Sequence, residues 1–125
     1  MEQDPRLVGA AALAYLGDSV LELLVRERLV GQGIYQSRKL NRMALDYVTA
    51  PRQAAAAERI LPLLSEEETT VGHRGRNLDH ANVPKSATKS EYLMASGLEA
   101  VFGYLHLKED RARMTELFRA AYPTE

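Results

Sequence analysis

The sequence predicts an all-α protein, built as a helical bundle. Apolar residues recur three or four positions apart over long stretches, and glycine or proline separates these stretches. No segment shows the alternation of apolar and polar residues that is typical of a strand. The chain has 125 residues, of which 46% are hydrophobic and 26% are charged. That size and composition suit one globular core, so we expect a single domain over residues 1–125.

Start and stop signals divide the chain into helices. Pro5 suits the first turn of the first helix, and Gly31 and Gly33 end it. Ser65 with Glu68, and Thr88 with Glu91, form capping-box patterns that open the fourth and fifth helices. Residues 77–86 include Pro84 and have no apolar period, so we expect a loop there. The expected helices are residues 6–30, 37–47, 51–64, 65 to between 72 and 75, 88–107 and 110–122.

Composition excludes several classes of protein. The chain has no cysteine, which rules out a disulfide framework and a thiolate metal site. No apolar run approaches the roughly 20 residues that cross a bilayer. The first five residues are acidic and lack the cationic start of a signal peptide. We therefore expect a cytoplasmic protein with no membrane association.

Charge is unevenly distributed along the chain. The formal net charge is −1, which does not by itself indicate a nucleic-acid partner. Residues 72–90, however, contain four cations and one acid: Arg74, Arg76, Lys85 and Lys89 against Asp79. Such a segment can bind phosphates. It can equally be an ordinary solvated loop, and charge alone favours that interpretation.

Two acids stand in helices that are apolar on nearly every side. We expect each of these helices to be buried all round, in the middle of the domain. Asp18 follows Gly17, and Glu99 lies between Gly97 and Gly103. A lone carboxylate inside a buried helix costs free energy unless it meets a cation or donors. Glycine inside a helix costs roughly 1 kcal/mol relative to alanine, so these glycines indicate a need for space. We expect the two helices to approach closely and their carboxylates to converge on a hard cation such as Mg²⁺.

Structural interpretations of the same acids remain open. One alternative is that Asp18 and Glu99 pair with arginines across the core, an arrangement that on spacing alone is at least as common. Glu22 lies one turn beyond Asp18, and a pair with Arg26, four residues on, is the better explanation for it. His106 is interpreted as a helix-end residue, since no second histidine lies at a metal-ligand spacing.

Four motifs resemble those of the ribonuclease III family. Leu13–Leu23 reads LAYLGDSVLEL, which is similar to the signature of that family, and residues 97–103 read GLEAVFG, which is similar to its second acidic element. Arg74–Asn77 (RGRN) and Pro84-Lys85 resemble motifs of the Mini-ribonuclease III subfamily. The resemblance covers nearly the whole chain and is to a stand-alone catalytic domain without a double-stranded-RNA-binding domain.

The resemblance implies a function. It implies an endoribonuclease that cuts double-stranded RNA and leaves 5′-phosphates, acting as a homodimer and maturing a ribosomal RNA precursor with a 23S-type stem. Asp18 and Glu99 would be the catalytic and metal-binding residues, holding Mg²⁺, with Mn²⁺ also possible because it accepts the same ligands. RNA phosphates would be bound by Arg74, Arg76, Asn77, Lys85 and Lys89.

The chain also departs from the family pattern. Ala11 and Ala14 replace two glutamates of the typical signature, and Ser96 replaces an aspartate three residues before the last glutamate. These changes leave the number of bound metals open. An alternative function is a catalytically silent module of the same fold that binds structured RNA. A di-metal redox bundle is disfavoured, because the chain has no Glu-x-x-His motif.

Overall fold

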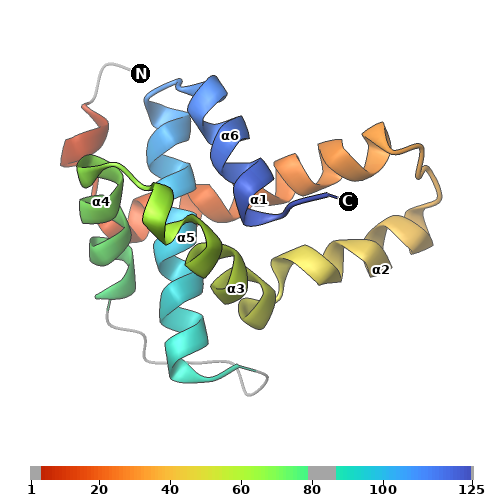
Figure 1. Ribbon diagram of the computed structural model, residues 1–125, viewed down its shortest axis with the longest axis horizontal. Coiled ribbons are helices and arrows are strands. Elements are labelled where there is room, and N and C mark those ends of the chain that lie inside the picture. The colour runs from red at the N-terminus through yellow and green to blue at the C-terminus, as the bar shows by residue number, and fades with distance from the viewer. Residues whose placement is uncertain (1–3, 79–86, 125) are drawn as a thin grey trace.

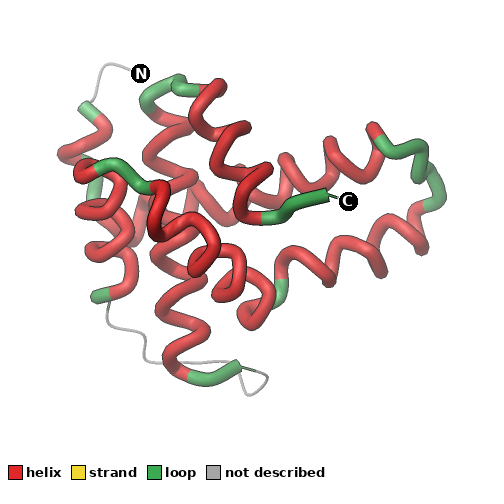
Figure 2. Tube along the Cα trace, in the orientation of Figure 1, coloured by secondary structure: helices red, strands yellow, loops and turns green. Residues whose placement is uncertain are grey.

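The computed structural model describes residues 4–78 and 87–124 (Figure 1). In these residues Figure 2 shows helices and loops and no strand, which confirms the all-α class. Two short 3₁₀ turns, Pro5–Leu7 and Leu61–Leu63, accompany the α-helices. The α-helices are α1 (Ala10–Gly31), α2 (Ser37–Val48), α3 (Ala50–Ile60), α4 (Glu66–Arg76), α5 (Lys89–Leu107) and α6 (Arg111–Ala121).

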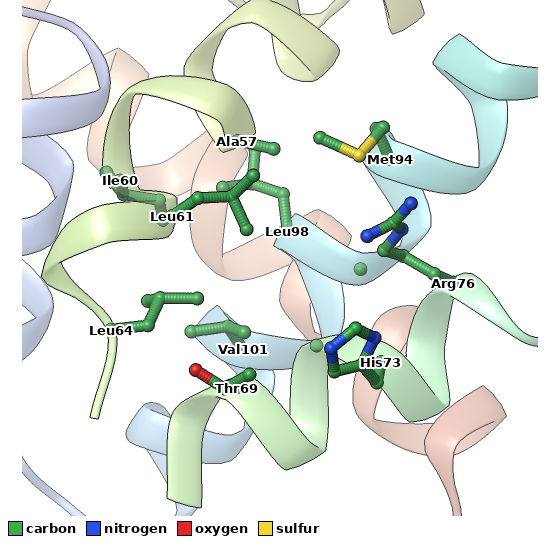
Figure 3. Close-up of a pocket in the computed structure, with 12 residues that line it drawn as sticks. Ala57, Ile60, Leu61, Leu64, Thr69, His73, Arg76, Met94, Leu98 and Val101 are labelled. Atoms are coloured by element: carbon green, nitrogen blue, oxygen red, sulfur yellow. The ribbon is translucent and has the colours of Figure 1, made fainter. Parts of the chain in front are cut away.

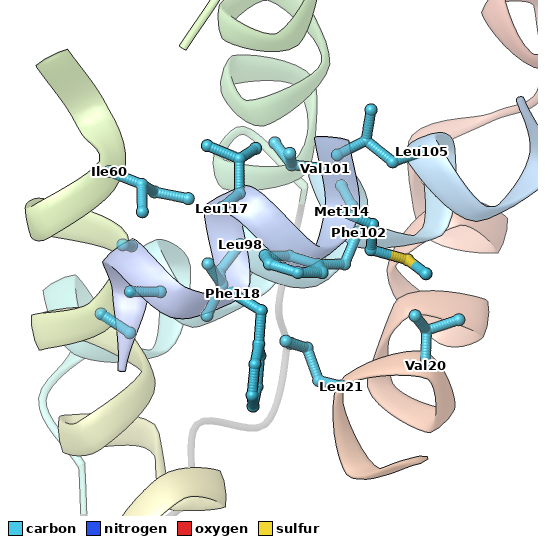
Figure 4. Packing of buried hydrophobic residues seen from close by; sticks show 14 of the residues in the cluster. Val20, Leu21, Ile60, Leu98, Val101, Phe102, Leu105, Met114, Leu117 and Phe118 are labelled. Atoms are coloured by element: carbon cyan, nitrogen blue, oxygen red, sulfur yellow. The ribbon is translucent and has the colours of Figure 1, made fainter. Parts of the chain in front are cut away.

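Helix α5 is the centre of the bundle. Helices α1, α3 and α4 pack directly on it, and α6 covers α3 and α5. Figure 1 shows α1 passing behind α5, while α1 and α2 extend together away from the other helices. Most of α5 after its first two turns is buried, because helices cover it on several sides. Figure 4 shows side chains of α1, α3, α5 and α6 meeting in the apolar core around Phe102.

Helix boundaries follow the predicted signals closely. Both capping boxes are present, at Ser65 with Glu68 and at Thr88 with Glu91. Helix α3 ends at Ile60 rather than near residue 64, because Pro62 lacks an amide hydrogen and the chain continues as a 3₁₀ turn. Pro5 opens a separate 3₁₀ turn, so α1 begins only at Ala10.

Helix α1 is not buried on all sides, and that prediction is wrong. Its inner face packs on α5, whereas Tyr15, Leu23 and Val30 on its outer face are 85%, 54% and 48% exposed. Asp18 is also exposed. Helix α1 is therefore apolar on two faces. Within one chain, the other helices cover only the inner face.

Helices α4 and α5 pack closely through small residues. A Cβ on Gly75 would lie 2.8 Å from the Cβ of Ala100, and one on Gly97 would lie 2.7 Å from Cγ of Arg76. Gly97 thus serves the contact with α4, not the space around Glu99 that its position in the sequence suggested.

Among the described residues, no helix has the length and apolar character needed to cross a membrane.

Candidate active site

The backbones of α1 and α5 touch where the two helices cross. A Cβ built on Gly17 would lie 1.6 Å from the carbonyl oxygen of Glu99, and one on Gly103 would lie 2.0 Å from the carbonyl oxygen of Leu13. Real Cβ atoms essentially never approach a heavy atom within 3.0 Å. Glycine is therefore required at both positions, which confirms the predicted need for space at Gly17 and Gly103.

The crossing brings Asp18 and Glu99 together. Asp18 lies on the exposed face of α1, Glu99 is half-buried on α5, and their carboxyl groups are within hydrogen-bonding reach. Burial first, and then the charge and hydrogen bond of Asp18, together raise the pKa of Glu99 to about 8. Two carboxylates this close ionise together only when a cation compensates their charge.

No cation of the described residues neutralises this pair. Neither Asp18 nor Glu99 forms an ion pair within residues 4–78 and 87–124, so the predicted alternative of arginine pairs across the core is not found there. Other carboxylates that are at least half-buried have partners. Those partners are Arg113 for Glu68, Arg26 for Glu22, Arg6 for Asp4, and helix N-terminal amides for Glu91 and Asp110.

Neighbouring candidates do not join the pair. Glu22 and Arg26 form an ion pair of 2.7 Å, as predicted. Ser96 is buried, and its hydroxyl donates to the carbonyl oxygen of Tyr92 at 3.0 Å. His106 lies exposed near the end of α5, as predicted. No group of three or more His, Asp or Glu side chains within the described residues is arranged to hold a metal.

Four of the predicted RNA-binding residues lie at the end of α4 or at the first residue of α5. Arg74 and Arg76 lie in the last turn of α4, not in a loop, because α4 continues to Arg76. Asn77 follows that helix and is exposed, and Lys89 is the exposed first residue of α5. Lys85 lies outside the described residues. Four of the five residues therefore lie at two helix ends, which are the end of α4, a helix that packs on α5, and the start of α5 itself.

Two of these arginines also make contacts within the protein. The Arg74 guanidinium donates to the carbonyl oxygen of Val8 at 3.2 Å, but the side chain remains exposed. The stem of Arg76 lies against Gly97, and its guanidinium borders a small apolar pocket between α3, α4 and α5 (Figure 3). His73 lies beside Arg76 at this pocket and was not singled out from the sequence, although it belongs to the same basic segment. Neither Asp18 nor Glu99 lines the pocket.

Comparison with known proteins shows the family to which this protein belongs. The family model "Ribonuclease III domain" matches residues 11–110. The chain belongs to the ribonuclease III family, and it is an endonuclease of that class, which acts on double-stranded RNA. The interpretation as an enzyme is thereby confirmed over that of a catalytically silent module.

Relatives of similar length refine this assignment. "Mini-ribonuclease 3" of Symbiobacterium thermophilum is 42% identical over 94% of this chain and 91% of its own length. "Mini-ribonuclease 3" of Enterococcus faecalis is 38% identical over 92% and 89%. A crystal structure of a Fusobacterium nucleatum protein is similar with a TM-score of 0.84 at 30% identity, over 94% of both chains. The resemblance to the Mini-ribonuclease III subfamily is confirmed.

Proposed function

We propose that this protein cleaves double-stranded RNA with a divalent ion bound by Asp18 and Glu99. The observation that carries the proposal is the meeting of these two carboxylates, from α1 and α5, without a cation among the described residues. Carboxylate oxygens are the ligands that Mg²⁺ prefers, and Mn²⁺ accepts them too. Ribonuclease III enzymes generally depend on a divalent metal.

The ligands present fit such an ion. Mg²⁺ binds oxygens at about 2.1 Å in octahedral geometry and is typically held by one or two carboxylates plus water and phosphate. Asp18 and Glu99, whose carboxyl groups are within hydrogen-bonding reach, would supply two of those oxygen ligands. A bound ion would supply Lewis acidity and lower the pKa of a coordinated water near the scissile phosphate. The backbone contact at Gly17 fixes α1 and α5, the helices that carry Asp18 and Glu99, relative to each other.

The basic residues beside α5 would hold the RNA. Arg74, Arg76, Asn77 and Lys89, together with Lys85, offer donors to phosphate oxygens. A-form RNA presents a wide, shallow minor groove that proteins recognise by shape and backbone. We infer a duplex substrate gripped mainly through phosphates. We further propose, from the subfamily resemblance, that the natural substrate is a stem of a ribosomal RNA precursor.

The outer face of α1 supports the proposal of a homodimer. Tyr15, Leu23 and Val30 are large apolar residues that one chain leaves exposed on this helix. An apolar face of this kind marks an interaction surface. Two-fold pairing through α1 would place two copies of Asp18 near one duplex, one for each strand.

A cleavage assay with matched variants tests the catalytic proposal. Wild type, Asp18→Asn and Asp46→Asn are incubated with an end-labelled RNA duplex in low salt, with Mg²⁺ and again with EDTA. Asp46 is an exposed carboxylate on α2, so Asp46→Asn makes the same chemical change away from the site. We expect Mg²⁺-dependent cutting by wild type and Asp46→Asn, and a loss of roughly 10²-fold or more in Asp18→Asn. Equal cutting by Asp18→Asn and wild type, with both proteins folded by circular dichroism, would place the active site elsewhere.

A further inference from the structure

A pocket away from the carboxylate pair lies between α2, α3 and the chain that follows α6. Its volume is about 290 Å³, close to the lower end of the range for small-molecule sites, which is roughly 300 Å³. The described residues that line it come from α2, α3 and residues 122–123, whereas Asp18 and Glu99 lie on α1 and α5. A ligand in this pocket would therefore occupy a site separate from the candidate active site.

Two arginines of α3 line this pocket. Arg52 and Arg59 are seven residues apart, which places them on one side of the helix, about 10 Å apart along its axis. Ala55 lies between them on the same side and also lines the pocket, so its small side chain leaves room between the two guanidinium groups. Both arginines are exposed, and together they can donate hydrogen bonds to one anion from two sides.

The two guanidinium groups differ in their contacts within the protein. Arg59 donates to the carbonyl oxygen of Ala121 at 2.8 Å, at the end of α6. An arginine has five N–H donors, so this bond holds the side chain in place and leaves other donors for a ligand. The side chain of Arg52 forms no hydrogen bond or ion pair with the described part of the chain. Packing therefore explains the position of Arg59, whereas Arg52 keeps all of its donors for an anion.

The charge of the pocket lining is positive on balance. Its described residues include Arg52, Arg59 and one acid, Asp46 of α2, so two minus one leaves a formal charge of +1. Asp46 is exposed, and it forms no ion pair with either arginine or any other described cation. An anion is therefore attracted to the α3 side of the pocket and repelled from the α2 side.

Two tyrosines supply aromatic surface to the same pocket. Tyr47 is half-buried and Tyr122 is buried, and their ring centroids are 5.1 Å apart. The Tyr122 hydroxyl donates to the carbonyl oxygen of Tyr47 at 2.8 Å, and the Arg28 guanidinium lies 5.8 Å from the centroid of the Tyr47 ring. These contacts hold the rings in place before a ligand arrives, which lowers the entropic cost of binding. Aromatic side chains stack with nucleobases and arginines bind phosphates, so the lining combines the two kinds of group that recognise a nucleotide.

We propose that this pocket binds a nucleoside 5′-monophosphate, whose phosphate is held by Arg52 and Arg59 and whose base packs on Tyr47. A free mononucleotide and the 5′-phosphorylated end of a single RNA strand share this chemistry, whereas a duplex cannot enter a pocket of this volume. The three residues lie outside α1 and α5. The inference is therefore independent of the metal site, and either proposal can fail without the other.

Isothermal titration calorimetry of the full chain with AMP tests the proposal. EDTA is present, so that no divalent ion at Asp18 and Glu99 can hold the phosphate. The proteins are wild type, Arg52→Gln and the control Arg38→Gln, which makes the same change at an exposed residue of α2 outside the described pocket lining. We expect wild type and Arg38→Gln to bind one AMP per chain with Kd values on the order of 1 mM or below, within about twofold of each other. Binding should be at least about fivefold weaker in Arg52→Gln, with folding of each protein checked by circular dichroism.

Changes to the ligand separate the phosphate from the base. Adenosine lacks the phosphate and ribose 5-phosphate lacks the base, so each should bind wild type at least about fivefold more weakly than AMP. A 5′-phosphorylated RNA trinucleotide that binds more tightly than AMP, and that depends on Arg52 to the same extent, would identify the end of a strand as the occupant. Tighter binding of AMP would identify a free nucleotide.

Three results would overturn the proposal. The first is no saturable binding of AMP or the trinucleotide below about 5 mM. The second is equal affinity of wild type and Arg52→Gln for AMP, which would place any bound nucleotide elsewhere. The third is equal affinity of wild type for AMP and adenosine, or for AMP and ribose 5-phosphate, because the pocket would then not recognise both parts of the nucleotide.

Discussion

Gly17→Ala perturbs the feature on which the site depends most directly. The added Cβ would lie 1.6 Å from the carbonyl oxygen of Glu99, 2.5 Å from its carbonyl carbon and 3.0 Å from its Cα. These are backbone atoms of a central helix, so no side-chain rotation relieves the contact. Helices α1 and α5 must separate by more than about 1 Å before the contact reaches the 3.0 Å limit of real Cβ atoms.

The expected cost follows from the packing around the crossing. Leu13 and Leu21 of α1 and Phe102 of α5 are all at most 1% exposed, and interiors packed this densely do not absorb such a shift. Overpacking typically costs 1–3 kcal/mol, occasionally more, and backbone-to-backbone contact belongs at the upper end. Alanine regains about 1 kcal/mol of helix propensity. We therefore expect a net destabilisation of roughly 2 kcal/mol, the upper-end cost of about 3 kcal/mol less the roughly 1 kcal/mol regained.

The assay is urea unfolding followed by far-ultraviolet circular dichroism, with Gly31→Ala as the control. Gly31 ends the same helix, and a Cβ there meets no atom within 4 Å, so its free energy of unfolding should stay unchanged or rise by up to about 1 kcal/mol. Gly17→Ala should also lose duplex cleavage at temperatures where it is folded, since Asp18 and Glu99 are pushed apart. If Gly17→Ala is as stable as wild type and cleaves normally, the close crossing is not what positions the site.

Two further predictions concern charge. The hydrogen bonds from Arg113 hold the pKa of the buried Glu68 below its ordinary value. The contact between Glu68 and Arg113 therefore contributes fully to the free energy of unfolding above the pKa that Glu68 has in the unfolded chain, near 4.5. This contribution is lost as the pH falls through the lower pKa that Glu68 has in the folded protein. We expect Glu68→Gln to cost about 1–3 kcal/mol at pH 7, with a smaller difference from wild type in urea unfolding at pH 3.5; an equal difference at both pH values would contradict this linkage. For RNA binding, Lys89→Gln should reduce the slope of log affinity against log salt by roughly one, while Lys39→Gln on α2 should leave it unchanged; equal slopes in all three proteins would remove Lys89 from the interface.

The helices were predictable because their signals are local. The capping boxes at Ser65 and Thr88 fix two helix starts through contacts three residues apart. The pair of Glu22 and Arg26 is equally local, and it was predicted. The approach of α1 and α5 was also predicted, because unexplained glycines beside acids in apolar helices indicate a crowded crossing.

The errors concern relations between distant segments. The sequence of α1 does not show which of its apolar residues one chain covers, so the exposure of Leu23 and Asp18 was missed. Gly97 was assigned to the surroundings of Glu99, but it faces Arg76 across a contact with α4. The contact of Arg74 with the carbonyl oxygen of Val8 joins residues 66 positions apart, and no local pattern indicates it.

The candidate site contains features that lower the stability of the folded protein. Elsewhere in the described chain, carboxylates that are at least half-buried meet cations or helix N-terminal amides, which lowers their cost. At the α1–α5 crossing, Gly17 and Gly103 have a lower helix propensity than alanine would have. The close helix contact that they permit brings the carboxyl group of Glu99 next to that of Asp18. A fold retains such a conflict where the arrangement serves function rather than packing. In the free protein this contact raises the pKa of Glu99. A divalent cation would compensate the charge of both carboxylates, so the same contact would then serve as shared coordination of the ion.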